Sequence, residues 1–353
     1  MTQHPRLFEP IQLGRYQLKH RIALAPLTRC RADETDGEGN GQLPNELMAE
    51  YYGQRASDGG LLINEATPIN PLTRFSERVP GIFTQKQIER WRLSTDAVHA
   101  KGGLIFLQLW HIGYHCRARF DPEGRLPPSA SVILGEETGE PKSRELSVEE
   151  IKEIVQDYAT AAKNSIEAGF DGVEIHGANT YLIDQFLSDK INKRTDDYGG
   201  SVEKRSRFLL EVVDAVVQAI GADRVGIRFS PWAISTIPVE QFSYALEKLN
   251  PYNLAFVHLV RQRLETPDDE GLRALRNSYK GVLILCRQYE PETAEKAVAD
   301  GLADIIAFGK LFISNPDLPN RIRKGAALAP WDDSTFYSSG PVGYTDYKSL
   351  AEE

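Results

Sequence analysis

The sequence predicts a protein of the α/β class: a single (β/α)8 TIM barrel over residues 1–353, with extended loops at its catalytic face. Three observations predict this fold. Eight short apolar runs, often β-branched, recur along the chain, segments with helical periodicity lie between most of them, and no low-complexity linker divides the series. Strands and helices that alternate at this spacing pair in parallel through right-handed crossovers, and eight such units close a barrel.

The predicted strands are apolar runs that mostly end in a turn or a polar residue. They cover residues 22–26, 60–66, 104–109, 172–176, 225–230, 255–260, 282–286 and 305–309. The predicted helices cover residues 86–100, 147–168, 203–220, 239–249 and 292–300. The second helix opens with a capping-box pattern, because Glu150 follows Ser147 by three residues. Residues 114–145 are long for a strand-to-helix connection, so we expect them at the catalytic rim.

The composition is that of an ordinary globular protein. Of 353 residues, 41% are hydrophobic and 26% charged, which is ample for a sizeable core. A formal net charge of −9 argues against a nucleic-acid-binding surface. The first residues lack the apolar core of a signal peptide, and no apolar run has the length of a membrane span. Cys30, Cys116 and Cys286 show no paired spacing, so we expect a reducing, cytoplasmic compartment and no disulfide.

The carboxyl ends of the predicted strands carry a set of polar residues. In barrels of this kind functional groups lie at those ends, and the last two strands often form a phosphate site. An Arg, a Gln and a Thr could line one face of a planar heteroaromatic ring. The pattern therefore predicts a phosphorylated ring cofactor across the barrel mouth. The residues that carry this prediction are Thr28, Ala66, Gln108, Arg228, Arg287, Gly309 and Lys310.

The fourth predicted strand ends in the most informative residues of the chain. His176, Asn179 and Tyr181 can all project from the end of this strand and the turn after it. A His–Asn pair offers two neutral hydrogen-bond donors to one acceptor, and a tyrosine beside them offers a proton. Such a set can polarise an unsaturated carbonyl and protonate its α-carbon. The alternative is a structural loop, in which the His and Asn satisfy backbone groups and the Tyr packs.

Seven segments of the chain together resemble the Old Yellow Enzyme family of FMN-dependent ene-reductases, which includes the oxophytodienoate reductases. The likeness runs from about residue 7 to residue 347. The matching segments are IALAPLTR at 22–29, PNELMAEYY at 44–52, FLQLWH at 106–111, GFDGVEIHGAN at 169–179, RTDDYGGS at 194–201, NPDLP at 315–319 and GYTDY at 343–347.

The resemblance implies an oxidoreductase in which NAD(P)H reduces FMN and a small enone-type molecule is reduced next, in a monomer or a homodimer. Thr28 would hydrogen-bond the flavin ring, and Gln108 and Arg228 would contact its pyrimidine end. The full set of implied cofactor contacts is Pro26, Leu27, Thr28, Ala66, Gln108, Arg228, Arg287, Gly309 and Lys310.

The resemblance also implies the substrate site. His176 and Asn179 would bind the activating carbonyl or nitro group, and Tyr181 would protonate the α-carbon. Trp110 and Tyr344 would shape the substrate pocket. Core packing is the alternative role for these last two aromatic residues.

The chain departs from the family where the FMN phosphate should lie. Glycines are usual after the seventh strand, but Arg287 and Gln288 stand there, and Lys310 replaces an arginine after the eighth. Either Arg287 supplies the charge geometry that Lys310 lacks, or it fills the phosphate site. The second interpretation predicts a flavin-free isomerase or cyclase that uses the His/Asn/Tyr set for redox-neutral acid catalysis. Changes in the substrate-side loops indicate a specialised substrate.

Two further patterns are weaker. His111 and His115 are four residues apart, but no carboxylate or third histidine is well placed beside them, so we expect no metal site and keep a metal-dependent hydrolase only as a check. The acidic residues of 33–38 and 268–270 are predicted to lie in solvated loops.

Overall fold

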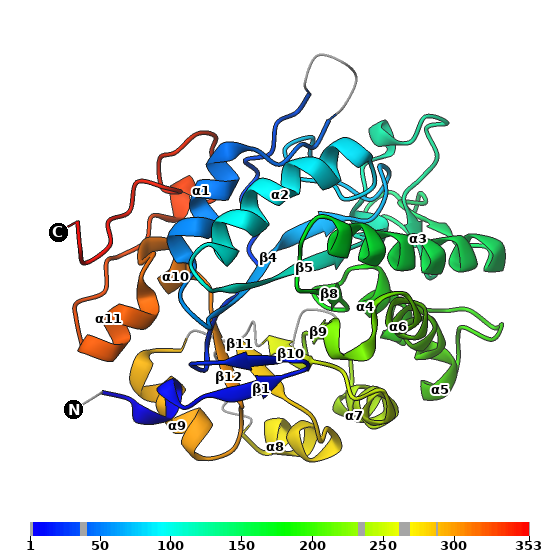
Figure 1. The fold of residues 1–353 in the computed structure, drawn as a ribbon. Helices are drawn as coiled ribbons and strands as arrows, with labels where there is room; N and C mark the ends of the chain where they lie inside the picture. The colour runs from blue at the N-terminus through cyan, green and yellow to red at the C-terminus, as the bar shows by residue number, and fades with distance from the viewer. Residues whose placement is uncertain (1–2, 36–40, 232–236, 261–268, 287–288, 353) are drawn as a thin grey trace.

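A computed structural model of the protein describes residues 3–35, 41–231, 237–260, 269–286 and 289–352. Eight parallel strands close a barrel in which each strand pairs with the next one along the chain, and the last pairs with the first (Figure 1). The predicted (β/α)8 barrel is therefore confirmed. Its strands are β3 (Ile22–Leu24), β4 (Leu61–Pro68), β5 (Leu104–Trp110), β8 (Gly172–His176), β9 (Val225–Phe229), β10 (Phe256–Val260), β11 (Leu283–Cys286) and β12 (Ile305–Phe308).

Helices surround the barrel (Figure 1). They are α1 (Glu46–Arg55), α2 (Gln85–His99), α3 (Val148–Glu167), α4 (Leu182–Leu187), α5 (Val202–Arg205), α6 (Arg207–Ile220), α7 (Val239–Leu249), α8 (Asp269–Ser278), α9 (Pro291–Ala299), α10 (Lys310–Ser314) and α11 (Leu318–Lys324). The capping box predicted for α3 is present: Glu150 N donates to Ser147 Oγ at 3.2 Å, and Ser147 N donates to Glu150 Oε2 at 2.9 Å. Within the described ranges, no helix has the length and apolarity needed to cross a membrane.

Two sequence predictions are corrected by the helices. The helix predicted over 203–220 is interrupted at Ser206, whose hydroxyl donates to Val202 O and accepts from Gln241. The acidic residues of 268–270 are not a loop where they are described, because α8 begins at Asp269. Asp33, also predicted to be solvated, accepts a hydrogen bond from Asn45 Nδ2 at 2.8 Å, whereas residues 36–38 lie outside the described ranges.

The amino-terminal hairpin was not predicted, and it closes the end of the barrel where the strands begin. Strands β1 (Ile11–Leu13) and β2 (Tyr16–Leu18) pair in an antiparallel ladder. Leu13 and Leu18 are fully buried in one cluster with apolar side chains such as Phe106 and Phe256. This cluster fills the end of the barrel where the strands begin. An open site can therefore form only at the opposite end, where the strands finish.

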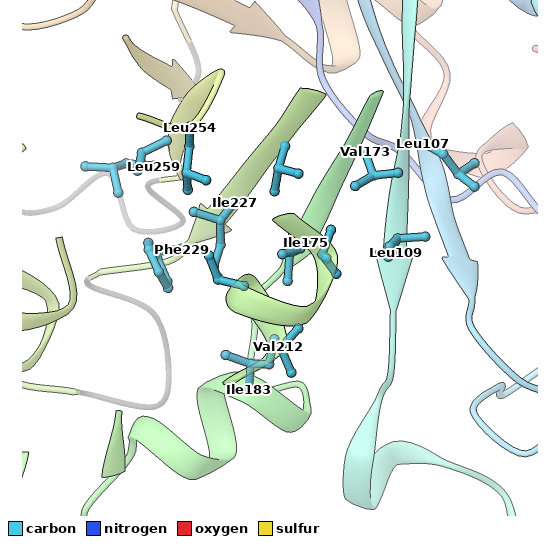
Figure 2. Close-up of a cluster of buried hydrophobic side chains, with 14 of the residues drawn as sticks. Leu107, Leu109, Val173, Ile175, Ile183, Val212, Ile227, Phe229, Leu254 and Leu259 are labelled. Carbon is cyan, nitrogen blue, oxygen red and sulfur yellow. The ribbon is translucent and has the colours of Figure 1, made fainter. Parts of the chain in front are cut away.

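The outer face of the barrel packs against its helices. Alternate residues of β5, β8 and β9, among them Leu109, Ile175 and Ile227, lie with Ile183 of α4 and Val212 of α6 in a buried cluster (Figure 2). This alternation follows from the period of two in a strand, which sends neighbouring side chains to opposite faces. The packing holds the ends of these strands in a fixed relation.

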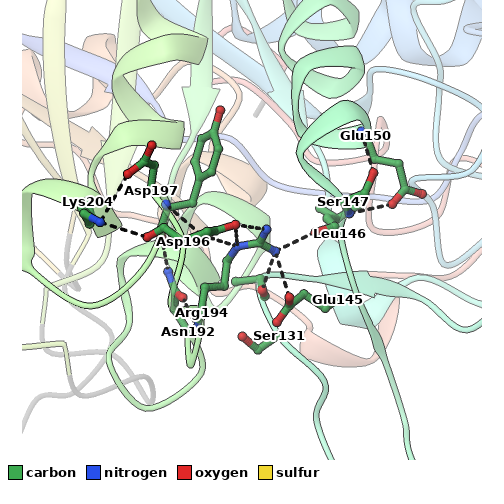
Figure 3. Close-up of polar contacts among 12 residues, drawn as sticks. Ser131, Glu145, Leu146, Ser147, Glu150, Asn192, Arg194, Asp196, Asp197 and Lys204 are labelled. Atoms are coloured by element: carbon green, nitrogen blue, oxygen red, sulfur yellow. Dashed lines mark hydrogen bonds and ion pairs between the residues drawn. The ribbon is translucent and has the colours of Figure 1, made fainter.

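The long connection after β5 is fixed to the connection after β8. The Arg194 guanidinium donates to the carbonyls of Ala130 at 3.2 Å and Leu146 at 2.6 Å, and it pairs with Asp196 (Figure 3). Its side chain is buried, so removing it would take this donor from the carbonyls of Ala130 and Leu146. This contact joins two connections that follow neighbouring barrel strands, in agreement with the predicted position of residues 114–145 at the rim.

Candidate active site

A cavity of about 630 Å³ opens where the barrel strands end. It brings together residues from β4, β5, β8 and β9 and the segments after β3 and β12. Of the sequence-predicted site residues that lie within the described ranges, all line it except Gly309 and Tyr344. The predicted residues that do line it are Pro26, Leu27, Thr28, Ala66, Gln108, Trp110, His176, Asn179, Tyr181, Arg228 and Lys310.

Tyr181 is held edge-on by two other rings of the cavity. Its ring centroid lies 4.9 Å from that of His176 and 5.0 Å from that of Trp110, with interplanar angles of 85° and 77°. His176 and Trp110 are themselves nearly parallel, at 18° and a centroid distance of 6.3 Å. Edge-to-face contacts of this kind fix a ring's orientation as well as its position. The tyrosine hydroxyl is therefore presented from a rigid aromatic wall.

The turn after β8 places Asn179 and Tyr181 in the same cavity. Asn179 and Thr180 both have left-handed backbone conformations, with φ of 61° and 62°. Asn tolerates this region, whereas a β-branched residue such as Thr is strained there. The surroundings hold the turn: Asn179 N donates to Ser230 Oγ at 2.7 Å, and Thr180 N donates to Asp184 Oδ2 at 2.9 Å.

His176 is a neutral donor. Burial lowers its pKa well below the usual value, and the Arg228 charge lowers it further. Its Nδ1 accepts a hydrogen bond from Ala178 N at 3.3 Å, so the single proton of the neutral ring is on Nε2. An Nε2–H group in the cavity can donate to a carbonyl oxygen without carrying a charge.

Tyr181 keeps its proton at physiological pH. Burial raises the pKa of its hydroxyl to about 12; the nearby Tyr337 adds to this shift and Arg228 opposes it. A protonated phenol beside two hydrogen-bond donors is suited to general-acid catalysis.

Comparisons with known proteins agree with this geometry. Residues 6–329 match the model of the NADH:flavin oxidoreductase / NADH oxidase family. The chain is 46% identical over 362 residues to 12-oxophytodienoate reductase 1 of Oryza sativa subsp. japonica, with 98% of this chain and 93% of the relative covered. It belongs to the Old Yellow Enzyme family. It is thus an oxidoreductase, as the sequence predicted.

Solved structures of Old Yellow Enzyme relatives share the whole fold. Morphinone reductase is 41% identical, with a TM-score of 0.89 over 98% of this chain and 96% of the other. A structure of morphinone reductase in complex with tetrahydroNAD is 43% identical, with a TM-score of 0.89 over 98% and 97% of the two chains.

One side of the cavity has the groups that a flavin ring requires. Thr28, Gln108 and Arg228 line it. The Arg228 Nε is buried and has no hydrogen-bond partner among the described residues, and an unpaired buried donor is costly. A ligand with acceptor atoms on a planar ring would satisfy it. The residues present therefore fit the ring of FMN, the cofactor that the Old Yellow Enzyme resemblance implies.

Lys310, which was predicted to meet the cofactor phosphate, has other partners in the structure. Lys310 Nζ lies 2.7 Å from Asp333 Oδ1 and above the rings of Trp331 and Phe336. A phosphate that approached Lys310 would therefore compete with a carboxylate of this chain. Gly309 lies beside the cavity wall, since a Cβ there would come within 3.6 Å of the Leu27 side chain. Arg287 and Gln288 lie outside the described residues, so their predicted roles stay predictions.

The prediction for Tyr344 is corrected: it does not line the cavity. Its ring is fully buried and stacks on Tyr51 at 4.1 Å, with the two planes 3° apart. Arg29 and Arg31 lie over it. Packing, the alternative considered for this residue, describes its place in the fold.

Sequence reasoning missed the residues that form the outer wall of the cavity. Phe336 and Tyr337 come from the segment that follows α11. Arg29 and Arg31 hold this segment by donating hydrogen bonds to its backbone carbonyls. Two arginines close together after β3, Arg29 and Arg31, indicated that this segment needed partners, but not which partners. The other lining residues not predicted are Arg29, Cys30, Phe75, Ser76, Arg78 and Ile313.

The two histidines weighed as a metal pair have other contacts. His111 Nδ1 accepts a hydrogen bond from Gly113 N, and burial lowers the His111 pKa to about 3. His115 Nε2 lies 2.9 Å from Thr180 Oγ1. Over the part of the chain that the structure describes, no three His, Cys, Asp or Glu side chains gather in a way that could hold a metal ion.

Proposed function

We propose that this protein is an FMN-dependent ene-reductase, which uses NAD(P)H to reduce the activated C=C bond of an α,β-unsaturated carbonyl compound. The observation that carries the proposal is the cavity that joins a neutral His176, Asn179 and a protonated Tyr181 to the ring-binding groups Gln108 and Arg228. Relatives named 12-oxophytodienoate reductase and morphinone reductase support it.

The residues of this chain would act as binders and as a proton donor. His176 Nε2–H and the Asn179 amide donate to the substrate carbonyl oxygen, which draws electron density from the β-carbon. FMN bound in the cavity and reduced by NAD(P)H would supply hydride chemistry at the β-carbon. Tyr181 then gives its proton to the α-carbon. The packing of Tyr181 against Trp110 would hold the Tyr181 hydroxyl beside the α-carbon of the substrate.

The cofactor would be held mainly at its ring. Thr28 and Gln108 offer hydrogen-bonding side chains, Arg228 offers positive charge toward an anionic reduced ring, and Pro26 and Leu27 form an apolar edge. Lys310 would meet the phosphate only by exchanging Asp333 for it.

We also propose a specialised substrate. Support comes from the outer wall, where Phe75, Ser76 and Arg78 meet the carboxy-terminal residues Phe336 and Tyr337. Turnover of simple 2-cyclohexenone as fast as that of any larger enone would contradict this part of the proposal.

The first experiment is the visible spectrum of the purified protein, followed by titration with FMN. We expect a flavin band, and NAD(P)H oxidation that depends on an added enone. A colourless protein that ignores FMN would overturn the proposal. That result would favour the flavin-free isomerase or cyclase. The Lys310–Asp333 ion pair supports this alternative, because Lys310 already has a carboxylate partner where the cofactor phosphate would bind.

A further inference from the structure

A buried polar layer lies inside the barrel between its apolar core and the cavity. Gln108 Nε2 donates to Glu174 Oε1 at 2.6 Å, and His258 Nδ1 lies 2.7 Å from Glu174 Oε2. The three side chains come from β5, β8 and β10, and none is more than 1% exposed. Only Gln108 lines the cavity. Glu174 and His258 therefore have no role among the residues that could touch a ligand there.

The donors and acceptors of this layer allow one arrangement. Burial lowers the pKa of His258, so its ring is neutral and has a single N–H. That hydrogen must be on Nδ1, where it meets the carboxylate, and Nε2 is left without a partner among the described residues. The Glu174 carboxylate, an acceptor, thus receives one hydrogen bond from His258 and one from Gln108.

The same reasoning fixes the amide of Gln108. If the amide were reversed, its oxygen would lie about as close to a Glu174 oxygen as the nitrogen does now, and two acceptors would repel each other. The NH2 group must therefore face Glu174, and Oε1 must point away from it. Gln108 Oε1 receives no hydrogen bond from any described residue, so it is an available acceptor on a cavity-lining side chain.

We propose that Glu174 and His258 are positioning residues for the cofactor: they hold the Gln108 amide so that its Oε1 accepts a hydrogen bond from the imide N–H of a flavin ring. This inference rests on the proposed function. The imide N–H is the donor on that edge of the ring, and an amide turned the other way would meet it with its NH2 group, a second donor. Glu174 and His258 fix the Gln108 amide in the accepting orientation before the cofactor binds.

The Glu174 charge also affects the ring. In the strand register, Arg228 of β9 pairs with His176 of β8 and with His258 of β10. Because Glu174 lies two residues before His176 on β8, the Arg228 cation lies one layer closer to the cavity than Glu174. A carboxylate below the cation offsets part of its field in this low-dielectric interior. Without that carboxylate, Arg228 would stabilise an anionic reduced flavin more strongly, and the midpoint potential would become more positive.

The test uses the FMN-loaded protein and Glu174→Gln. We expect FMN to bind about tenfold more weakly, as for the loss of one hydrogen bond, with a more positive midpoint potential. Flavin fluorescence titration gives the affinity, and a spectroelectrochemical titration gives the potential. The control is Ile284→Val, which shortens a buried apolar side chain opposite His258 in the register and removes no polar group.

A second pair of variants tests the histidine. His258→Asn retains a side-chain N–H near the position of Nδ1 and should bind FMN within about twofold of the wild type. His258→Leu fills similar space without a donor and should match Glu174→Gln in affinity. Equal FMN affinities in His258→Asn and His258→Leu would overturn the role of His258. This comparison stands even if Glu174→Gln does not fold.

A double-mutant cycle tests whether the effect passes through Gln108. In a Gln108→Leu background, Glu174→Gln should cause no further loss of FMN affinity. Full additivity of the two losses, or a potential unchanged in Glu174→Gln, would overturn the inference while leaving the proposed function intact. A wild-type protein that binds no FMN would overturn both, so the two failures are distinguishable.

Discussion

Tyr181 meets the ring of His176 edge-on, with centroids 4.9 Å apart and planes at 85°. The contact joins the two chemical roles of the cavity, because the neutral imidazole can bind a carbonyl oxygen while the phenol keeps a proton for the adjacent carbon. The strand that ends at His176 and the left-handed turn after it produce this arrangement within six residues.

Tyr181→Phe should separate the two halves of the reaction. The variant keeps the edge-to-face packing against His176 and Trp110 but has no proton to give, so substrate reduction should slow by about 10²- to 10⁴-fold. Flavin reduction by NAD(P)H should be unchanged. Stopped-flow measurement of each half-reaction checks this, with Tyr337→Phe as a control on another cavity tyrosine. Equal slowing of both halves would contradict the assigned role.

Binding of substrate should not follow the titration of His176. Its pKa lies well below the usual value because of burial, so the ring stays neutral throughout the range from about pH 5.5 to 8.5. We expect the Kd of a non-reactive carbonyl ligand to be constant over that range. A loss of affinity above about pH 6.5 would show that the cation, and not the neutral donor, binds the ligand.

Local patterns in the sequence predicted the frame of this site. Strand ends, the α3 capping box and the His176–Asn179–Tyr181 spacing depend on neighbouring residues, so they could be read directly. Tyr344 lies in a segment that resembles the family, but the resemblance did not reveal that its ring stacks on Tyr51.

The outer wall could not be predicted because it depends on distant partners. Arg31 holds the carbonyls of Thr335 and Phe336 across more than 300 residues of sequence, and this places Phe336 and Tyr337 at the cavity. The amino-terminal hairpin, with three residues in each strand, is too short to show a clear alternation.

Thr180→Gly should stabilise the protein. Thr180 has a φ of 62°, which glycine adopts at no steric cost. Glycine also loses the exposed hydrogen bond between Thr180 Oγ1 and His115, so the free energy of unfolding should rise by less than about 1 kcal/mol. Thr180→Ala keeps the strain and loses the hydrogen bond with His115, so it should be less stable than the wild type. Urea denaturation of the three proteins checks the order. A glycine variant less stable than the alanine variant would contradict this account.

Glu65→Gln should change how stability depends on pH. Burial raises the pKa of Glu65 to about 7 from 4.5, so the folded state holds this proton more tightly than the unfolded state does. Wild-type stability from this group is complete below about pH 4.5 and is lost as the pH rises toward 7. Glutamine does not titrate, so the stability of the variant relative to the wild type should increase by up to about 3 kcal/mol across this window. Urea denaturation at several pH values checks this, and a constant difference would contradict it.

Asp333→Asn should strengthen the binding of FMN but not of riboflavin. Asp333 accepts from Lys310 at 2.7 Å, and this contact lowers the pKa of the Asp333 carboxyl. If the protein binds FMN as proposed, the cofactor phosphate would have to compete with that carboxylate for the same ammonium group. Asparagine removes the competing charge, so FMN affinity should rise by about threefold, as expected for a solvent-exposed ion pair.

Riboflavin shares the ring of FMN and lacks its phosphate, so its affinity measures the ring contacts alone. Lys310→Met should weaken FMN and leave riboflavin unchanged, the opposite of the Asp333→Asn effect. Both effects should decrease in high salt, because the side chains of this pair are exposed to solvent. Parallel changes for the two ligands would show that Lys310 and Asp333 act on the ring through Phe336, which lies under the ammonium group and lines the cavity. In that case the phosphate is bound elsewhere, and the positions after β11 become the next to change.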